Sequence, residues 1–391
     1  MGMLRFLTAG ESHGKALVAV VEGVPAGLAL SEDYIAEDLR RRQGGYGRGR
    51  RQKIEQDRAE IIAGVRHGLT LGSPIALSIE NRDWANWQEV MAIEPATGPV
   101  EKVTHLRPGH ADLPGVIKYF QDDVRPVLER ASARETAARV AVGAVCRRLL
   151  EEFDVRVHSH TVAIGDVEAQ VDGEPDWEAV ERSLVRCAEP AAEKAMVAAI
   201  DAARNDGDSL GGVLEVWATG VPIGLGSHVH WDRRIDGLLA QALMSIQSVK
   251  GAEIGGGFGL ARQRGSQVHD VILPIADWGE WPWRRASNRA GGTEGGMTDG
   301  EPVVARAALK PISTIPRALP SADLVTGEQV PAHYERADVC VVPAAGVIAE
   351  AMVCIVLAQA LLEKFGGDHV QETKRNWHAY LATTGPRGGE E

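Results

Sequence analysis

Residues 40–51 read RRRQGGYGRGRR, so six arginines and four glycines occupy twelve positions near the start of the chain. Arginine presents a permanently charged planar fork that fits phosphate and carboxylate groups, and glycine lets the backbone approach a ligand closely. Because the formal net charge of the whole chain is −12, this segment is not part of a generally basic surface. We expect it to bind a compact, strongly anionic partner, although its first three arginines also fit the solvated end of a helix.

Two histidines lie in tight loops beside small or charged residues. His13 belongs to GESHG (10–14), and His110 belongs to LRPGHAD (106–112), where a Pro-Gly turn can present Arg107 and His110 to one ligand. Histidine titrates near neutral pH, so each ring could act as an acid or as a cation beside an anion. The alternative for both is a loop histidine that bonds the backbone.

Three further segments combine cations with glycine or hydroxyl residues: RASARET (130–136), NRAGGTEGG (288–296) and KPIST (310–314). The first opens an expected helix, where free N–H groups and the hydroxyls of Ser132 and Thr136 could bind phosphate. In ERAD (335–338), Arg336 and Asp338 share one face if the backbone is extended. These segments add candidate anion ligands to the arginine-rich one.

Two His-x-His pairs suggest a metal site less strongly. Alternation along a strand would place His158 with His160, and His228 with His230, on one face. No cysteine or suitably spaced carboxylate completes either set, so polar strand faces are the simpler interpretation and we expect no metal. The sequence also lacks the P-loop and Rossmann fingerprints of nucleotide-binding proteins.

The composition describes a soluble globular chain of 391 residues with 44% hydrophobic and 25% charged residues. A pI near 5.5 and 5% aromatic residues argue against nucleic-acid binding, the natural rival interpretation of a basic segment. The four cysteines form no CxxC pair, which favours a reducing, cytoplasmic setting. The N-terminus lacks the pattern of a signal peptide.

Alternating segments such as LVAVVEG (17–23) and IALSIEN (75–81) predict strands, and a helix is expected after Ser31. Longer helices are expected at 134–153 and 347–365, and the polar residues of the second favour a buried core helix over a membrane span. Strands grouped apart from helices predict an α+β fold with antiparallel sheets.

An internal repeat divides the chain. The matching blocks are 10–28 with 207–225, 64–75 with 292–303, and 149–153 with 361–365. They predict one domain over 1–391, a pseudo-twofold β-α-β sandwich whose similar halves, about 1–153 and 205–367, place antiparallel sheets on either side of buried helices. The less patterned residues 154–204 would join the halves, and about 380–391 would be a disordered tail.

The chain resembles the chorismate synthase family. The motifs that carry the resemblance, in family order, are GESHG (10–14), GYGRGRR (45–51), RPGHAD (107–112), RASARETAARVA (130–141), VKGAEIGGGF (249–258), NRAGG (288–292), KPIST (310–314) and RAD (336–338). The resemblance implies the last common step of the shikimate pathway to aromatic amino acids. In that step, 5-enolpyruvylshikimate 3-phosphate loses phosphate by 1,4-anti elimination to give chorismate, and reduced FMN is required without net oxidation.

The resemblance also implies residue roles. His13 would protonate or stabilise the departing phosphate, His110 would set the protonation of the reduced flavin, and Asp338 with Ser12 would assist proton removal by flavin N5. Substrate charges would be held by Arg42, Arg48, Arg107, Arg134 and Arg336. Flavin contacts would come from Arg130, Ala131, Ser132, Gln247, Ser248, Gly295, Lys310, Pro311, Ile312, Ser313, Thr314 and Arg336.

The family further implies a cytoplasmic homotetramer that takes reduced flavin from an external source, and an association with NADP. The tryptophan-rich segment 276–285 departs from the family pattern, as either a surface flap or an assembly contact. Two rival functions remain: a flavin oxidoreductase with net hydride transfer, and a module that binds anions or nucleic acid without catalysis.

Overall fold

The computed structural model describes residues 4–49, 56–275, 283–335 and 338–385, and within them two antiparallel sheets dominate. The four-stranded sheet has the order β1 (Arg5–Ala9), β2 (Ala16–Glu22), β6 (Ile75–Glu80) and β3 (Ala59–Ala63). The five-stranded sheet has the order β10 (Val249–Ile254), β15 (Val303–Leu309), β9 (Gly212–Thr219), β7 (Arg156–Ile164) and β8 (Val167–Glu168). The predicted α+β fold with antiparallel sheets is confirmed.

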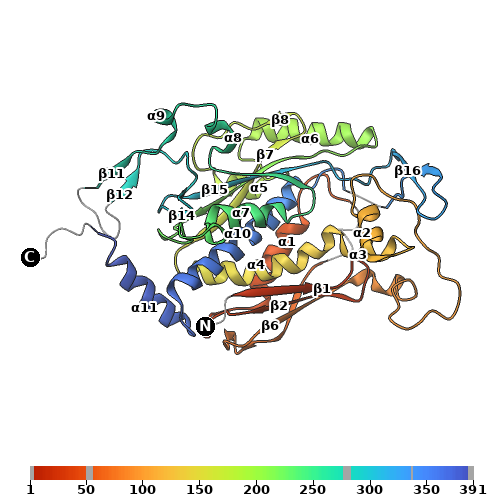
Figure 1. Ribbon diagram of the computed structural model, residues 1–391, viewed down its shortest axis with the longest axis horizontal. Helices are drawn as coiled ribbons and strands as arrows, with labels where there is room; N and C mark the ends of the chain where they lie inside the picture. The colour runs from red at the N-terminus through yellow and green to blue at the C-terminus, as the bar shows by residue number, and fades with distance from the viewer. Residues whose placement is uncertain (1–3, 50–55, 276–282, 336–337, 386–391) are drawn as a thin grey trace, which may run out of the picture.

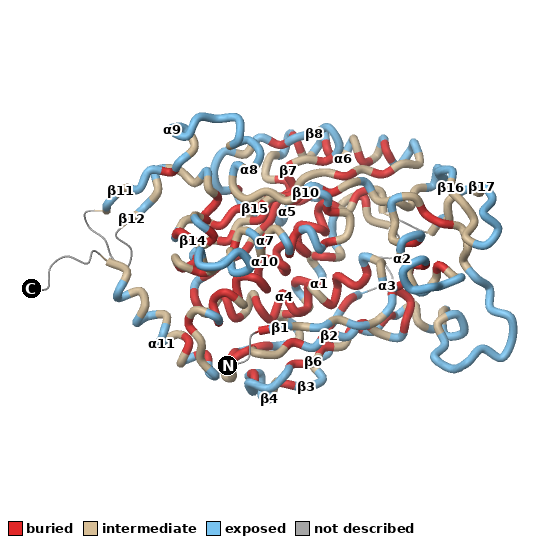
Figure 2. The backbone as a smooth tube through the Cα atoms, viewed as in Figure 1, coloured by how far each residue is buried: buried red, intermediate tan, exposed pale blue. Residues whose placement is uncertain are grey.

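Helices fill the space between the two sheets, as Figure 1 shows. They are α1 (Glu32–Gln43), α4 (Thr136–Glu151), α7 (Ile235–Met244) and α10 (Val342–Phe365). The buried part of the chain coincides with this helical layer and with the sheet faces turned toward it (Figure 2). α6 (Pro190–Asn205) lies on the outer side of the five-stranded sheet, beside β8.

α10 is apolar on all sides, as expected of a helix surrounded by protein. Among the described residues it is the one helix long and apolar enough to cross a membrane, but 94% of its most apolar window is buried inside the fold. Its contact with α4 is close, because a Cβ added at Gly143 would lie 2.3 Å from the Cβ of Ala351. The predicted core helix is confirmed, and it begins at Val342 rather than at 347.

The repeat has a structural counterpart in how the strands follow one another. Four strands of each sheet follow the same order. In β1-β2-β6-β3 and in β7-β9-β15-β10, the first strand along the chain lies beside the second and the second beside the fourth. The third strand, β3 or β10, lies at the outer side of the fourth. The strand that corresponds to β1 is β7, which lies within the expected linker 154–204. That part of the prediction is wrong, because β7 pairs with β9 along its whole length and so belongs to the five-stranded sheet.

Matched positions of the repeat also make matched hydrogen bonds. Thr70 Oγ1 donates to the carbonyl of Pro25 at 2.6 Å. Thr298 Oγ1 donates to the carbonyl of Pro222, also at 2.6 Å. Each threonine lies in a short hairpin, and each proline follows the second strand of its half, so the same contact closes the same corner twice.

Smaller elements complete the fold. Within the part of the chain that the structure describes, the remaining helices are α2 (Asp112–Tyr119), α3 (Arg125–Arg130), α5 (Trp177–Arg182), α8 (Gly257–Leu260), α9 (Gly265–Val268) and α11 (Val370–Leu381), with 3₁₀ helices η2 (Arg82–Asn86), η3 (Ala133–Glu135) and η4 (Trp231–Arg233). The short hairpins are β4 (Val65–Arg66) with β5 (Leu69–Thr70), β11 (Ile272–Pro274) with β12 (Trp283–Arg285), β13 (Thr293–Glu294) with β14 (Met297–Thr298), and β16 (Pro320–Ala322) with β17 (Gln329–Pro331).

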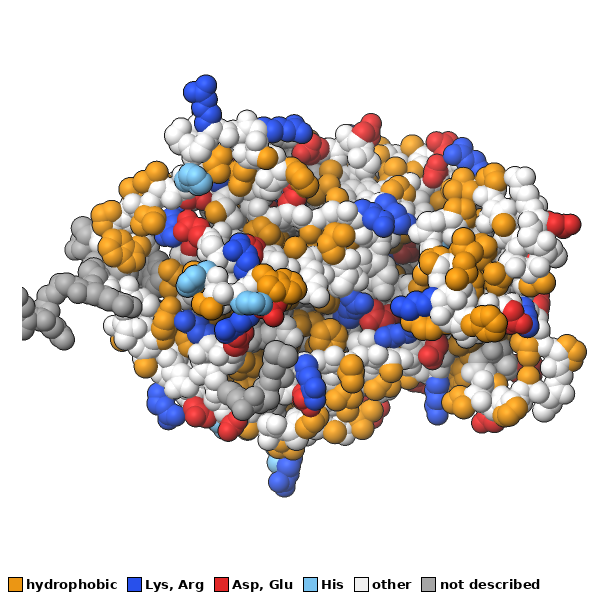
Figure 3. Space-filling view, in the orientation of Figure 1, with side chains coloured by type: hydrophobic (Ala, Val, Ile, Leu, Met, Phe, Trp, Pro, Cys, Tyr) orange, Lys and Arg blue, Asp and Glu red, His pale blue; other side chains and the backbone are white. Residues whose placement is uncertain are grey.

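One end of the molecule has its own small core. Leu106, Val116, Val124 and Leu128 pack together where α2 and α3 meet the β16–β17 hairpin. Hydrophobic side chains also gather on the surface at this end, on the right in Figure 3. Phe120 at the end of α2 is 99% exposed.

The C-terminal prediction needs a correction at its boundary. α11 continues to Leu381, and the Tyr380 hydroxyl donates to the carbonyl of Ile223 at 3.2 Å, so the chain is ordered past 380. Residues 386–391 lie outside the described part. Most of the tryptophan-rich segment, 276–282, also lies outside it, and only Trp283–Arg285 is seen, as strand β12.

Candidate active site

A cavity of about 950 Å³ collects loops from both halves of the chain. Sixteen of the predicted site residues line it: Ser12, His13, Arg42, Arg48, Arg107, His110, Ala131, Ser132, Arg134, Gln247, Ser248, Lys310, Ile312, Ser313, Thr314 and Asp338. Such a volume lies within the range of small-molecule sites. The structure therefore brings together residues that are up to 326 positions apart, from Ser12 to Asp338.

Three predicted residues do not line this cavity. The Arg130 guanidinium donates to the carbonyls of Thr8 and Gly10, both at 3.0 Å. Gly295 lies at the turn of the β13–β14 hairpin, and Pro311 is likewise absent from the lining. Arg336 lies outside the described residues.

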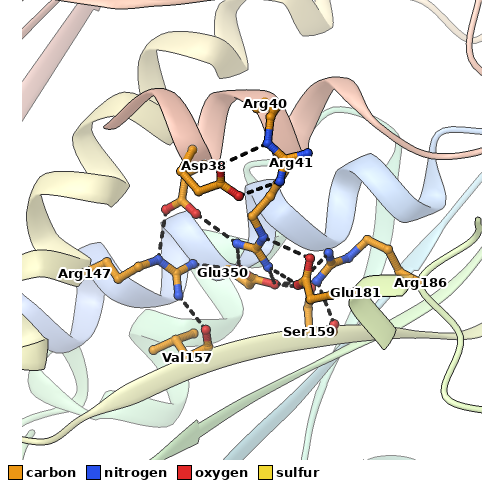
Figure 4. A network of polar contacts seen from close by, with 10 residues as sticks. Asp38, Arg40, Arg41, Arg147, Val157, Ser159, Glu181, Arg186 and Glu350 are labelled. Carbon is orange, nitrogen blue, oxygen red and sulfur yellow. Dashed lines mark hydrogen bonds and ion pairs between the residues drawn. The ribbon is translucent and has the colours of Figure 1, made fainter. Parts of the chain in front are cut away.

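The arginine-rich segment 40–51 is divided among several environments. Arg40 pairs with Glu37 on the surface. Arg41 donates to Glu350 and to Asp38 in the buried network of Figure 4. Of its described arginines, only Arg42 and Arg48 line the cavity, together with Gly47 and Gly49, while residues 50 and 51 lie outside the described part. The expectation that the whole segment forms one anion receptor is wrong.

Glu350 of α10 is the centre of that network. Its carboxylate accepts hydrogen bonds from Arg41, Arg147, Arg186 and Ser159, which come from three different elements and a loop (Figure 4). Burial alone would raise the pKa of Glu350, but the three arginines hold it well below its usual range. Because Arg41 belongs to the last turn of α1, the network fixes this end of the helix. It thereby also positions Arg42, which faces the cavity.

Arg42 and Arg134 converge on one buried carboxylate, Asp57. Arg134 donates to both Asp57 oxygens at 2.5 and 2.6 Å, and Arg42 Nη1 lies 3.5 Å from Asp57 Oδ2. Burial lowers the pKa of Arg42 to about 9, with Arg48 and Arg134 adding to the effect and Asp57 opposing it. Among the described residues, Arg42, Arg48 and Arg134 face only two carboxylates, Asp57 and Asp338, so this wall stays positive and an added anion would be stabilised there.

Thr136 and Asp338 have partners of their own in the structure. Thr136 Oγ1 donates to the carbonyl of Ala133 and accepts from Arg42 Nε, so its expected role as a free hydroxyl donor is wrong. Asp338 lies 3.0 Å from Arg48 Nη1 and accepts from the amide of Gly49 at 2.6 Å. These two contacts of Asp338, with Arg48 and with Gly49, hold the glycine-rich loop against the other side of the cavity.

His110 is held by Asp112, two residues further along the chain. Its Nδ1 lies 2.5 Å from Asp112 Oδ1, and Arg107 donates to both oxygens of the same carboxylate at 2.8 and 2.9 Å. Burial alone would raise the pKa of Asp112, but hydrogen bonds from Arg107 and His110 lower it below its usual range. The expected Pro-Gly turn does present Arg107 and His110 to one space.

Across that turn lies the KPIST loop. Gly109 has a φ of +77°, and a Cβ added there would lie 3.7 Å from both Lys310 Nζ and Ser313 Cβ. Partial burial lowers the pKa of Lys310, and Lys250 lowers it further. Glycine is favoured at 109 by the positive φ of this turn rather than by lack of space, and the turn lies beside the second cation-bearing loop.

His13 is covered by Trp87 and bonded to Glu129. The two rings stack at a centroid distance of 3.8 Å, and Nδ1 lies 2.9 Å from Glu129 Oε1. The hydroxyls of Ser12 and Ser132 lie 3.1 Å apart beside it. The cavity therefore combines a concentration of cations with two oriented imidazoles, an arrangement suited to binding a polyanion and stabilising a departing anionic group.

Comparison with known proteins identifies the family. The family model described as chorismate synthase matches residues 4–362. The chain belongs to the chorismate synthase family. It is 56% identical to the chorismate synthase of Acidothermus cellulolyticus, with 97% of this chain and 99% of that one covered. It is 58% identical to the chorismate synthase of Moorella thermoacetica, again with 97% of this chain and 99% of that one covered.

A solved structure agrees. The chain matches the structure titled "Crystal Structure of Chorismate Synthase" with a TM-score of 0.79 and 47% identity, over 98% of this chain and 99% of that one. The cavity described above thus belongs to a chorismate synthase fold.

The His-x-His pairs lie outside this cavity. His158 stacks on Trp177 at 5.0 Å, and His160 Nε2 lies 3.0 Å from Glu215 Oε1 on the outer face of β7 and β9. His228 and His230 do not lie on a strand, so the expected alternation is wrong there. No group of three or more possible metal ligands occurs among the described residues.

Proposed function

We propose that this enzyme converts 5-enolpyruvylshikimate 3-phosphate to chorismate by anti-1,4-elimination of phosphate, with reduced FMN required but not consumed. The family membership supports this proposal. The observation that carries it is one cavity in which Arg42, Arg48, Arg107 and Arg134 meet two histidines. The reaction is the last common step of the shikimate pathway to aromatic amino acids.

The substrate carries one phosphate and two carboxylates, and the arginines supply matching positive charge. Arg42, Arg48 and Arg134 hold one part of the substrate's charge beside Asp57, and Arg107 holds another beside His110. Arg336 completes the set in the proposal. Because several of these arginines already bond carboxylates, their guanidinium planes are oriented before the substrate arrives, which lowers the entropy cost of binding.

The cavity also suits a flavin. Apolar side chains of Ile246, Ala344 and Ile348 line it and suit a flat ring. The hydroxyls of Ser313 and Thr314 line it too and could donate hydrogen bonds to a phosphate. The residues that would hold FMN are Ala131, Ser132, Gln247, Ser248 and 310–314, with Arg130, Gly295 and Arg336 as further candidates. When bound, reduced FMN would supply the transient electron density that loosens the C–O bond.

The two imidazoles have separate tasks in the proposal. His13 holds a proton toward the departing phosphate and stabilises its charge. His110, fixed by Asp112, sets the protonation of the reduced flavin. Asp338 and Ser12 assist removal of the ring proton.

An anaerobic assay with reduced FMN tests the proposal. We expect phosphate and chorismate to appear in equal amounts, while the absorbance of the flavin is the same at the end as at the start. A flavin oxidoreductase would instead oxidise or reduce flavin in step with turnover. A binding module would bind the substrate with a steep salt dependence and release no phosphate, and either result contradicts the proposal.

We also propose a homotetramer in the cytoplasm that receives reduced flavin from an external source. The outer face of the four-stranded sheet supports assembly, because Leu7, Val18 and Val20 are exposed there and Leu7 lies opposite Val20 in the register. Exposed flat apolar faces commonly mark interfaces.

Finally, we propose that the chain is one chorismate synthase-like domain whose halves are related by a pseudo-twofold axis. The equal succession of strands and the matched bonds of Thr70 and Thr298 support this relation. In this proposal, the first half covers about 5–151 and the second about 156–365.

A further inference from the structure

The carboxylate of Glu129 is fully buried beneath the loop that carries His13. Glu129 belongs to α3, and its side chain has 0% exposure. Its Oε2 accepts the backbone N–H of His13 at 2.7 Å, while Oε1 and Oε2 lie 2.9 and 3.1 Å from the ring Nδ1. The backbone carbonyl of Glu129 accepts the amide of Ser12 at 3.2 Å. One residue thus holds both the loop and the imidazole ring.

The chemistry of this contact decides which ring nitrogen faces the cavity. A buried carboxylate with ionised oxygens can only accept hydrogen bonds, so Nδ1 of His13 must carry a proton. The other nitrogen, Nε2, lies on the far side of the ring from Glu129, and the proton that His13 holds toward the departing phosphate in the proposed function is a second one, at Nε2. The same arrangement of carboxylate, Nδ1–H and working Nε2 orients the histidine of serine-protease triads.

Neighbouring groups keep the carboxylate available for His13. Trp87 covers one face of the His13 imidazole. The guanidinium of Arg125 lies 5.3 Å from the centroid of the Trp87 indole. Arg125 is shared between two carboxylates, because its Nη1 lies 3.3 Å from Glu129 and 3.0 Å from Glu335. Arg125 is therefore only a partial partner of Glu129.

Glu335 is the second carboxylate that Arg125 contacts. Burial alone would raise the pKa of Glu335, but a hydrogen bond from His333 and the charges of Arg125 and Arg107 lower it to about 2. Two carboxylates, Glu129 and Glu335, therefore share the one guanidinium of Arg125.

We propose that Glu129 is a positioning residue for His13, which holds Nδ1–H and thereby directs Nε2 toward the leaving anion. This inference rests on the proposed function, because it presumes that His13 acts on the departing phosphate. An amide in place of the carboxylate can donate to Nδ1 and so stabilise the opposite tautomer without changing the size of the side chain.

A double-mutant cycle tests it with the full-length enzyme in the anaerobic phosphate-release assay. Glu129→Gln should lower kcat about 10- to 1,000-fold while KM for the substrate changes less than about 3-fold. In a His13→Ala background, Glu129→Gln should change kcat by less than about 2-fold, since the residue acts through the imidazole. The matched control is Glu215→Gln, which alters another buried glutamate bonded to a histidine but outside the cavity lining; its kcat should stay within about 2-fold of wild type.

Each result is decisive. Wild-type kcat in Glu129→Gln, or an equal loss with and without His13, overturns the positioning role. If His13→Ala itself keeps wild-type kcat, the role of His13 in the proposed function is wrong and that of Glu129 falls with it. If His13→Ala is slow and Glu129→Gln is not, only the inference on Glu129 is wrong.

A second measurement is made on the wild-type protein, so it does not depend on how Glu129→Gln folds. In histidine-selective ¹⁵N NMR, the signals of His13 are those missing from His13→Ala. The proposal requires a proton on Nδ1 of His13. A bare Nδ1 overturns it, whatever the outcome of the activity assays.

Discussion

At the scale of single residues, the cavity uses one arrangement twice. His13 and His110 each place Nδ1 against a buried carboxylate, Glu129 in one case and Asp112 in the other. The sequence predicted both imidazoles but only one carboxylate could be suspected. Asp112 is two residues from His110, whereas Glu129 is 116 residues from His13 and has no local signal. Asp57 was missed for the same reason.

The histidines give the first prediction at this scale. His13→Ala and His110→Ala should each lower kcat about ten- to ten-thousand-fold, because general acid–base groups contribute on this order. The measurement is phosphate release under anaerobic conditions with reduced FMN. Thermal unfolding serves as the control and should show a folded protein in both cases. Wild-type rates from either variant would remove the role assigned to that histidine.

The division of segment 40–51 gives a second prediction. Arg48→Ala should raise KM for the substrate about tenfold or more with a smaller effect on kcat, because it removes a charge-assisted contact with an anion. Arg40→Ala is the matched control, since Arg40 pairs with Glu37 at the surface of the same segment. Equal KM values for the two variants would mean that the cavity-facing arginine does not bind substrate.

At the scale of elements, local signals predicted what local forces determine. Ser31 caps α1 by accepting from the amide of Tyr34 at 3.2 Å, and the helix ends at Gln43 as its charge pattern indicates. The alternation of His158 and His160 indicated a strand within the expected linker, but not that this strand belongs to the second sheet, because its place there depends on long-range pairing with β9. Long-range partners, such as those of Arg41 in the Glu350 network, are equally invisible to sequence patterns.

That network gives a prediction for how α10 is held. Glu350→Ala should lower the free energy of unfolding by about 3–5 kcal/mol, because three buried arginines lose their shared carboxylate. Glu363→Ala on the same helix is the control, since its pair with Arg233 is exposed and should contribute about 0–1 kcal/mol. Denaturant unfolding measures both. Similar losses for the two variants would show that the buried network does not stabilise the helical layer.

The same carboxylate gives a pH dependence with a defined sign. The folded-state pKa of Glu350 is lowered, so its contribution is present above the unfolded value near 4.3 and is lost as the pH falls through the lower, folded value. Wild type should therefore lose stability more steeply than Glu350→Gln as the pH falls below about 4. Parallel pH profiles of the unfolding midpoint would contradict this.

At the scale of the whole molecule, the sequence predicted the class of fold and the convergence of the site better than its boundaries. The repeat was visible because glycine, threonine and proline must recur where the same corner recurs, as at Thr70 and Thr298. In the proposed division, the second half begins earlier than the repeat suggests, because β7 lies beside β9 as β1 lies beside β2 but does not share the sequence of β1. Helices sandwiched between sheets explain why a helix like α10 can be apolar on every side.

Assembly gives the last prediction. The outer face of the four-stranded sheet exposes Leu7, of which 78% is accessible, directly opposite Val20. Leu7→Glu should convert the proposed tetramer into smaller species, because a charge buried in an apolar interface without a partner is costly. Sedimentation equilibrium measures the mass, and circular dichroism checks that the fold is kept. Leu184→Glu, an exposed leucine outside this face, should leave the mass unchanged. A monomeric wild type would contradict the tetramer itself, whereas an unchanged tetramer in Leu7→Glu would place the subunit interface on another face.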